Sequence, residues 1–226
     1  MRPLLFKKED LYNKELLQVS HETEVPLSVL KGFFALESAF NVSAKRYEKH
    51  RDDSSYGLSQ VLYKTAKGFG YKGEPEGLMD AYTSAYYGAK FIKQLSKKHK
   101  NILDIIASYN MGWPRKIEQT TKFIAKIYSY PYSYKTNPPA RWVYANQPYV
   151  DRVASYIAYY QALEKNDIPK AWDIYKLIKK KSYGSAMKYI VNPFGIYGLA
   201  NQFLQNKTLV YSTMGLVAGL FLLKRY

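Results

Sequence analysis

Apolar side chains recur at helical spacing along most of the first 165 residues, and this pattern limits the chain to a mainly helical fold. In the segment 27–39, for example, Leu30, Phe33 and Phe34 share one face. Alternation of apolar and polar residues, the mark of a half-buried strand, is almost absent. We therefore predict an all-α fold, or an α fold with a trivial sheet. The expected helices span residues 8–23, 27–39, 78–98, 102–109, 116–128 and 149–164. Residues 56–68 are expected to begin with a tight turn at Gly57 and to continue as a short helix ended by Gly68.

Polar and turn-forming stretches divide this helical pattern. Residues 41–55 are polar and charged, and residues 129–148 are rich in Tyr, Pro and Asn, so we predict irregular loops in both places. The sequence Asn166-Asp167-Ile168-Pro169 marks a boundary. We predict three parts: a helical domain over 1–165, a basic helical linker over 166–207 and a hydrophobic C-terminal segment over 208–226.

The charge balance is strongly basic, because 34 Lys and Arg residues oppose 18 Asp and Glu residues and give a formal net charge of +16. Such a chain is attracted to polyanions: nucleic acid, an anionic membrane or a bacterial envelope. The absence of cysteine excludes disulfides, thiolate metal sites and a cysteine nucleophile. His21, His50 and His99 are far apart and form no HExxH motif. We therefore expect no metal and no cofactor.

The segment 208–223 contains sixteen residues without a charge. As a helix it would extend about 24 Å, against a hydrocarbon layer of about 30 Å. The flanking Lys207, Lys224 and Arg225 suit the polar surface of a bilayer. We predict that this segment is transmembrane and binds a lipid membrane. The alternative is a buried C-terminal helix of a soluble fold.

Glu37 is the candidate catalytic residue. It lies near the end of an otherwise apolar predicted helix, close in sequence to Phe33, Phe34 and Phe40. A carboxyl group in apolar surroundings loses hydration, so its pKa should rise. A carboxylic acid that keeps its proton near neutrality can act as a general acid, for example on a glycosidic oxygen. The alternative for this residue alone is a glutamate on a helix surface.

Four sequence blocks around Glu37 occur in the order found in the soluble lytic transglycosylase family, which the chain resembles over residues 20–162. Each block alone is weak, but four in order with compatible gaps are specific. The helix containing Asp80 and Gly88 also resembles the family pattern. The blocks are Glu37-Ser38-Ala39-Phe40, then Gly57-Leu58-Ser59-Gln60-Val61 with Thr65-Ala66, then Ser108-Tyr109-Asn110-Met111-Gly112, and finally Tyr149-Val150 with Val153.

This resemblance implies a lysozyme-like catalytic domain that binds a peptidoglycan glycan strand. It implies cleavage of the β-1,4 bond between N-acetylmuramic acid and N-acetylglucosamine without water, leaving a 1,6-anhydromuramic end. Glu37 would protonate the leaving oxygen and then accept the proton of the muramic C6 hydroxyl. One carboxyl is enough because the nucleophile belongs to the substrate. The matched substrate-binding residues would be Ser38, Gly57, Gln60, Tyr109, Asn110 and Tyr149.

The resemblance also implies a separate role for each polar residue. Gln60 and Asn110 would hydrogen-bond sugar N-acetyl and hydroxyl groups, Tyr109 would orient Glu37, and Tyr149 would line the same cleft. The alternatives are structural. Gln60 would begin a helix, Asn110 would end one, and the two tyrosines would be core aromatics.

The chain departs from the family pattern at several positions. Ser59 replaces the usual Met and would alter one wall of the sugar cleft, Ser84 replaces the usual Asn, Ser108 replaces Ala and Tyr63 replaces Pro. The segment 113–148 is longer than usual. We expect these departures to affect recognition of the substrate more than the activity, because none of them removes the catalytic acid.

Other functions remain open from the sequence. If Asp52 or Asp53 faced the cleft, the same fold would act as a hydrolytic muramidase with two carboxylates; the alternative is that both are solvated loop charges. The basic charge with interleaved Tyr and Lys also fits a nucleic-acid-binding or structural virion protein.

The cellular setting is also an expectation. The apolar run in residues 1–10 is three residues, too short for the core of a secretory signal. Together with the charge and the hydrophobic segment 208–223, this predicts a bacteriophage virion protein, anchored in a membrane by its C-terminus and in contact with other virion proteins. The alternative location is a bacterial membrane.

Overall fold

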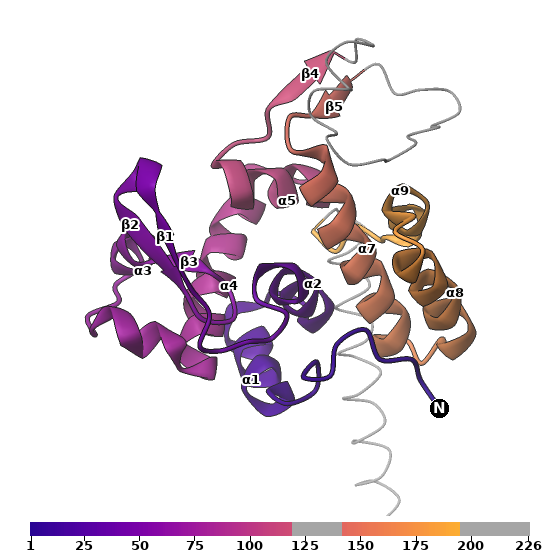
Figure 1. Cartoon of the computed structure of the whole chain (residues 1–226), viewed down its shortest axis with the longest axis horizontal. Helices are drawn as coiled ribbons and strands as arrows, with labels where there is room; N and C mark the ends of the chain where they lie inside the picture. The colour runs from indigo at the N-terminus through magenta and orange to yellow at the C-terminus, as the bar shows by residue number, and fades with distance from the viewer. Residues whose placement is uncertain (119–141, 195–226) are drawn as a thin grey trace, which may run out of the picture. The chain divides into compact units, whose positions relative to one another are not determined.

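The computed structural model describes residues 1–118 and 142–194. Helices predominate and a small antiparallel sheet accompanies them (Figure 1), which confirms the predicted fold class. The elements in chain order are α1 (Asn13–Thr23), α2 (Leu27–Glu37), β1 (Lys45–Glu48), η1 (Lys49–Arg51), β2 (Asp53–Tyr56), β3 (Val61–Leu62), α3 (Tyr63–Gly68), η2 (Pro75–Met79), α4 (Ala81–Lys98), α5 (Ile102–Met111), β4 (Lys116–Glu118), β5 (Trp142–Tyr144), α7 (Gln147–Glu164), α8 (Ile168–Lys179), α9 (Tyr183–Ala186) and η3 (Met187–Tyr189).

Helix α2 is the centre of the core. It packs along α7, and α1 packs against both α2 and α4 (Figure 1). The apolar face predicted from the sequence is fully buried at Leu30, Phe33 and Phe34. Gly32 allows the close approach of the two central helices, since a Cβ atom there would lie 2.3 Å from Ile157 Cγ1. Burial of this face against α7 fixes the position of the C-terminal end of α2, where Glu37 lies.

The predicted loop over 41–55 is wrong, because β1 and β2 form an antiparallel hairpin there and β3 adds a third strand. The tight turn at Gly57 and the short helix ended by Gly68, predicted for residues 56–68, are confirmed: Gly57 has φ of 68°, and α3 covers Tyr63–Gly68. The strands are two to four residues long, and β1 is almost entirely exposed. Such short strands bury no regular face, so they produce no alternating pattern in the sequence.

A second correction concerns the residues that flank the undescribed segment 119–141. Lys116–Glu118, predicted as the start of a helix, form β4, which pairs with β5. Trp142–Tyr144, predicted as irregular, form β5, and α7 begins at Gln147 within the predicted loop. The rest of the predicted helix over 116–128 and of the loop over 129–148 lies outside the described residues.

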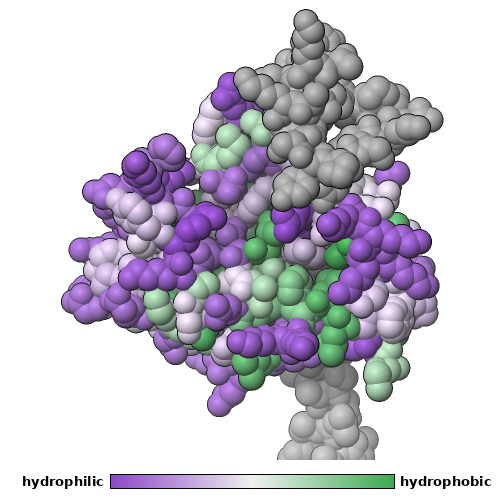
Figure 2. Space-filling model, in the orientation of Figure 1, coloured by the Kyte–Doolittle hydropathy of each residue, from purple (hydrophilic) through white to green (hydrophobic). Residues whose placement is uncertain are grey.

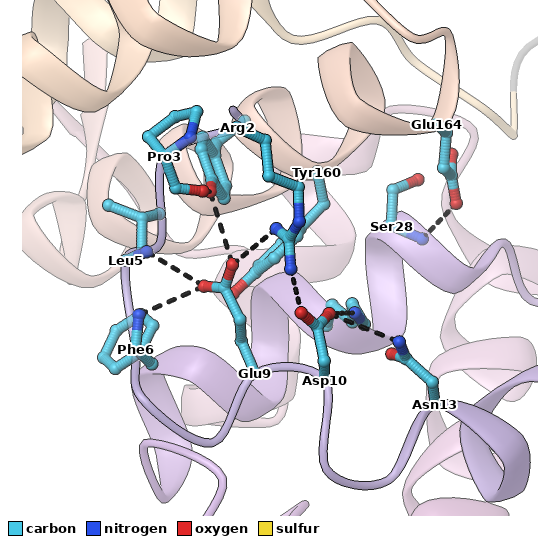
Figure 3. Close-up of polar contacts among 12 residues, drawn as sticks. Arg2, Pro3, Leu5, Phe6, Glu9, Asp10, Asn13, Ser28, Tyr160 and Glu164 are labelled. Atoms are coloured by element: carbon cyan, nitrogen blue, oxygen red, sulfur yellow. Dashed lines mark hydrogen bonds and ion pairs between the residues drawn. The ribbon is translucent and has the colours of Figure 1, made fainter. Parts of the chain in front are cut away.

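A buried carboxylate ties the N-terminal segment to the helices (Figure 3). Glu9 is 1% exposed and accepts hydrogen bonds from the backbone N–H groups of Leu5 and Phe6, both at 3.0 Å, and from Arg2 Nη1 at 2.7 Å. The Tyr160 hydroxyl of α7 donates to the same group at 3.2 Å. All of these groups donate hydrogen bonds to the Glu9 carboxylate, so the buried negative charge is compensated. The same contacts hold the N-terminal segment against α7.

Beyond α7, α8 and α9 pack on that helix within one compact unit, Met1–Val191. The proposed division of the chain at residues 165 and 207 stays a prediction. Across the described helices, none has both the length and the apolar character needed to cross a membrane. The predicted transmembrane segment 208–223 lies outside the described residues.

Candidate active site

Glu37 lies at the C-terminal end of α2 and lines a pocket of about 160 Å³. The helix ends there because Ala39 and Phe40 take left-handed backbone conformations, with φ of 51° and 60°. Left-handed conformations at two successive non-glycine residues are strained. Complete burial of the Phe40 side chain holds the backbone in this conformation. The turn therefore fixes Glu37 at the edge of the core. The other walls of the pocket come from the β1–β2 hairpin, β3, α3, α4 and α5.

The Glu37 carboxyl group is a weaker acid than an ordinary glutamic acid. Burial raises its pKa to about 7; the hydrogen bond from Tyr149 and the charge of Arg46 act in the opposite direction, and the charge of Glu48 adds to the rise. The apolar part of this environment is an aromatic cluster in which the Tyr109 ring packs at a tilt against Phe33 and Phe91, with centroid distances of 4.6 and 5.0 Å. Desolvation therefore dominates, in the direction that the sequence predicts.

Tyr149 holds one oxygen of this carboxyl group. Its hydroxyl donates to Glu37 Oε1 at 2.5 Å. The pKa of Tyr149 is well above its usual value, because of burial and then the Glu37 charge, so the phenol keeps its proton and donates. Among residues 1–118 and 142–194, no group hydrogen-bonds Glu37 Oε2. The arrangement leaves one oxygen of the acid available to a ligand.

Replacement of Tyr149 by Phe should raise the pKa of Glu37 above 7, because the lost hydrogen bond favours the ionised form. If Glu37 acts as the acid, the fall of activity on the alkaline side should move to higher pH. The maximal rate should drop about tenfold, as expected for a hydrogen bond to a charged group. The pH dependence of the cleavage rate measures both effects.

Tyr144→Phe is the matched control for this substitution. Tyr144 also donates to a carboxylate at 2.5 Å, but its partner is Asp104. Neither residue lines the Glu37 pocket. An equal change in the pH profile for both variants would contradict the role of Tyr149.

Tyr109 and Asn110 line the pocket, whereas Tyr149, which was expected to line the same cleft, is not among its lining residues. The Tyr109 hydroxyl, however, donates to the Ser59 carbonyl at 2.7 Å, so the residue that holds Glu37 by a hydrogen bond is Tyr149 and not Tyr109. Asn110 is exposed, and its Oδ1 accepts from Asn146 Nδ2 at 3.1 Å. The Asn110 oxygen is therefore engaged within the protein.

Gln60 lines the pocket, but its amide is occupied by the protein. Nε2 donates to the carbonyls of Ala44 and Gly57, both at 3.0 Å, and Oε1 accepts from the Ser55 hydroxyl at 3.0 Å. The predicted hydrogen bonds from Gln60 to a sugar would compete with these three. Its main effect in the structure is to join the turn before β3 to β2.

Ser38 and Gly57 do not line the pocket. The Ser38 hydroxyl donates to the Leu58 carbonyl at 2.9 Å. Gly57 has φ of 68°, and its backbone N–H donates to the Ala44 carbonyl at 2.8 Å. Ser38 therefore joins the end of α2 to the turn that carries Gln60, and Gly57 joins that turn to the segment before β1.

The position of Ser59 in the structure contradicts the expectation that this residue alters one wall of the sugar cleft. Ser59 and Ser84 are both fully buried, and the Ser59 hydroxyl donates to the Ser84 carbonyl at 2.8 Å. Ser59 does not line the pocket. These two departures from the family pattern therefore meet at a contact between the turn and α4. There each serine provides a partner for the other.

Asp52 and Asp53 also lie outside the pocket. Asp52 is exposed and accepts from the Tyr47 hydroxyl at 2.8 Å. Asp53 is buried, and its Oδ2 accepts from the backbone N–H of Lys64 at 2.9 Å. The alternative of solvated loop charges therefore fits Asp52 and fails for Asp53, which holds the hairpin against α3.

Three charged residues that line the pocket have no role in the predictions from sequence: Arg46, Glu48 and Arg51. Arg46 Nε donates to Glu48 Oε1 at 2.6 Å. All three lie in a run of mixed charges that is typical of a solvated loop, and only the β1–β2 pairing brings them to Glu37. Within 1–118 and 142–194, no cluster of His, Asp and Glu could hold a metal ion.

Comparison with known families gives one decisive match: the Transglycosylase SLT domain matches residues 16–128, which are 113 of the 226 residues. The chain belongs to the Transglycosylase SLT domain family. Glu37, Gln60 and Asn110 of this SLT domain lie inside the matched range. Tyr149, which holds the carboxyl group of Glu37, lies beyond it.

Two further comparisons describe the neighbours of this SLT domain. A search of curated proteins finds no match. One similar solved structure is described as the complex of the 70-kDa soluble lytic transglycosylase with bulgecin A; the sequence identity is 21%, the TM-score is 0.48, and the match covers 69% of the present chain. The chain spans about a quarter of the length of that protein, since the match covers 25% of it.

Proposed function

We propose that this SLT domain is a peptidoglycan lytic transglycosylase. It cleaves the β-1,4 bond between N-acetylmuramic acid and N-acetylglucosamine and leaves 1,6-anhydromuramic ends. The observation that carries the proposal is the Glu37 carboxyl group, which has a pKa of about 7 in a polar pocket and has one oxygen held by Tyr149. An acid of this strength is matched to proton transfer near neutral pH.

The proposed reaction needs one carboxyl group and no water. Glu37 donates its proton to the glycosidic oxygen as the bond from that oxygen to muramic C1 breaks. The C6 hydroxyl oxygen of the same sugar then bonds to C1, and its proton returns to Glu37. Because the nucleophile is held within the substrate, the ring closure has the advantage of an intramolecular reaction.

A hydrolytic muramidase is the second candidate, and one observation favours it. A two-carboxylate mechanism needs a partner for Glu37 that activates water or attacks the sugar. Among the described residues that line the pocket, Glu48 is the other carboxylate, and Arg46 donates to it. Because Arg46 already engages the Glu48 carboxylate, we place hydrolysis second.

The test is the chemical nature of the chain ends that the full-length protein produces from purified peptidoglycan. Mass spectrometry of the soluble fragments should show ends one water lighter than reducing ends. Reducing ends would establish a muramidase and direct attention to Glu48. No fragments would favour a binding or structural protein, and the polyanion bound by its +16 charge would be the next question.

We further propose that the protein opens the wall locally for a bacteriophage particle, with residues 208–223 as a membrane anchor. The basic charge and the hydrophobic composition of that segment support the proposal. Removal of residues 208–226 should release the protein from lipid vesicles in a sedimentation assay and leave cleavage of peptidoglycan intact. A full-length chain that does not sediment with vesicles would contradict the anchor.

A further inference from the structure

Two guanidinium groups line the pocket that contains Glu37, and they differ in their partners. Arg46 of β1 donates to Glu48 at 2.6 Å, so a carboxylate of the same strand balances its charge. Arg51 belongs to η1 at the tip of the hairpin and is exposed. In the part of the chain that the structure describes, no carboxylate pairs with the Arg51 guanidinium.

The backbone that carries Arg51 is held in place before any ligand binds. Lys64 Nζ donates to the Asp52 carbonyl at 2.8 Å and to the Arg51 carbonyl at 3.4 Å. Buried Asp53 accepts from the Lys64 backbone N–H at 2.9 Å. The tip of the hairpin is thus tied to α3 on the side next to Arg51. A charged side chain on such a fixed element loses less conformational entropy on binding.

Of the described charged groups that line the pocket, only the positive charge of Arg51 is not balanced by another lining residue. Glu48 is balanced by Arg46, and Glu37 keeps its proton over much of the range below neutral pH. The surface over β1 and β2 is predominantly hydrophilic on the face shown in Figure 2. The pocket therefore offers a planar cation, with donors arranged for a carboxylate, within a polar wall.

We propose that Arg51 binds a carboxylate of the muramic acid side of the substrate, so that the domain selects glycan strands by their charge. This inference rests on the proposed function, because it assigns a substrate group to the same pocket. The two alternating sugars differ in this respect: N-acetylglucosamine is neutral, whereas muramic acid carries a lactyl group. That group ends in a carboxylate when bare, and when it bears a stem peptide the carboxylates belong to the peptide. Both sources present the same chemistry to a guanidinium.

Three substrates separate these sources for the full-length protein: peptide-bearing strands, strands stripped of peptide by an amidase, and stripped strands whose lactyl carboxylates have been reduced to alcohols. Arg51→Gln should lower kcat/KM about tenfold on carboxylate-bearing strands, the usual size of a lost charged hydrogen bond. It should match the wild type on reduced strands. A loss on peptide-bearing strands alone assigns the stem peptide, and a loss on stripped strands alone assigns the lactyl group. A loss on both shows that Arg51 binds either carboxylate.

Lys49→Gln is the matched control, because it removes the same charge from the same short helix at a residue that does not line the pocket. It should leave kcat/KM within twofold of the wild type on all three substrates. Equal losses for the two variants, or a loss for Arg51→Gln that is the same on reduced strands, would overturn the proposal.

Binding measurements keep this inference separate from the proposed reaction. Calorimetry with the Glu37→Gln protein, with and without Arg51→Gln, reports affinity for the three strands without any cleavage. A wild type that cuts no substrate, together with about tenfold weaker binding of carboxylate-bearing strands by the Arg51 variant, would refute the enzyme and support the carboxylate site. Equal affinities for the two proteins would refute the site whatever the reaction is.

Discussion

Glu37→Gln in the full-length chain should lower the rate of strand cleavage by about a thousandfold or more. General acid catalysis contributes about 10² to 10⁴ in rate, and the proposed mechanism uses this one carboxyl group first as acid and then as base. Glutamine has nearly the same shape and still accepts the Tyr149 hydrogen bond, but it carries no transferable proton. The initial rate of soluble fragment release at pH 6 gives the comparison.

Asp52→Asn is the control for this variant, since Asp52 is a carboxylate of the β1–β2 hairpin that lies outside the pocket. Its activity should equal that of the wild type. Comparable activity of Glu37→Gln and wild type would remove Glu37 from the mechanism.

The same substitution should change stability in a pH-dependent way that does not involve substrate. The folded pKa of Glu37 is about 7 against 4.5 in its ordinary state, so its favourable contribution is complete below pH 4.5 and is lost as the pH rises through 7. Glutamine cannot ionise. Above pH 7 the variant should therefore gain up to ~3 kcal/mol relative to the wild type, since each tenfold change in proton affinity corresponds to about 1.4 kcal/mol. Denaturant unfolding at pH 5 and pH 8 measures this difference.

Gly57→Ala should destabilise the protein by about 4 kcal/mol, because two separate penalties act at this position. The residue has φ of 68°, and a Cβ atom would lie 2.2 Å from the Leu78 carbonyl oxygen and 2.4 Å from the Ser84 hydroxyl oxygen. The Leu78 carbonyl oxygen belongs to the backbone, so no side-chain rotation can relieve this clash. The midpoint of thermal unfolding should fall by roughly 10 °C.

Two other glycines separate these penalties. Gly70 has φ of 92°, and no atom lies within 4 Å of the position that a Cβ atom would take, so Gly70→Ala should show the backbone penalty alone. Gly68 has neither problem, and Gly68→Ala should be close to neutral. The expected order of stability is Gly68→Ala, then Gly70→Ala, then Gly57→Ala. A Gly57→Ala protein as stable as the Gly68 variant would show that the turn before β3 is not a tight contact.

The helices were predictable from the sequence because their signal is local. The face of α2 that carries Leu30, Phe33 and Phe34 recurs every three or four residues and is buried as expected. The same helix places Glu37 at its end, and α5 brings Tyr109 and Asn110 to the pocket. Local periodicity and short sequence blocks therefore indicated Glu37 as the candidate acid, together with two residues that line its pocket.

The rest of the site depends on contacts between distant segments, which no local pattern records. The hydrogen bond from Tyr149 to Glu37 joins residues 112 positions apart. The hairpin that brings Arg46 and Arg51 to the pocket consists of short strands in a charged run. Gln60 is predicted from the sequence to bind the sugar. In the folded chain, its side-chain amide instead forms hydrogen bonds with Ala44, Gly57 and Ser55.

Titration of the Glu37 carboxyl group tests most directly whether this residue keeps its proton near neutral pH. The full-length protein is labelled with ¹³C at the glutamate carboxyl carbons, and its NMR spectra are followed from pH 3 to pH 9. Glu37→Gln identifies the resonance that belongs to Glu37. The structure predicts a midpoint near pH 7. A midpoint near 4.5, the ordinary value for glutamic acid, would contradict the account.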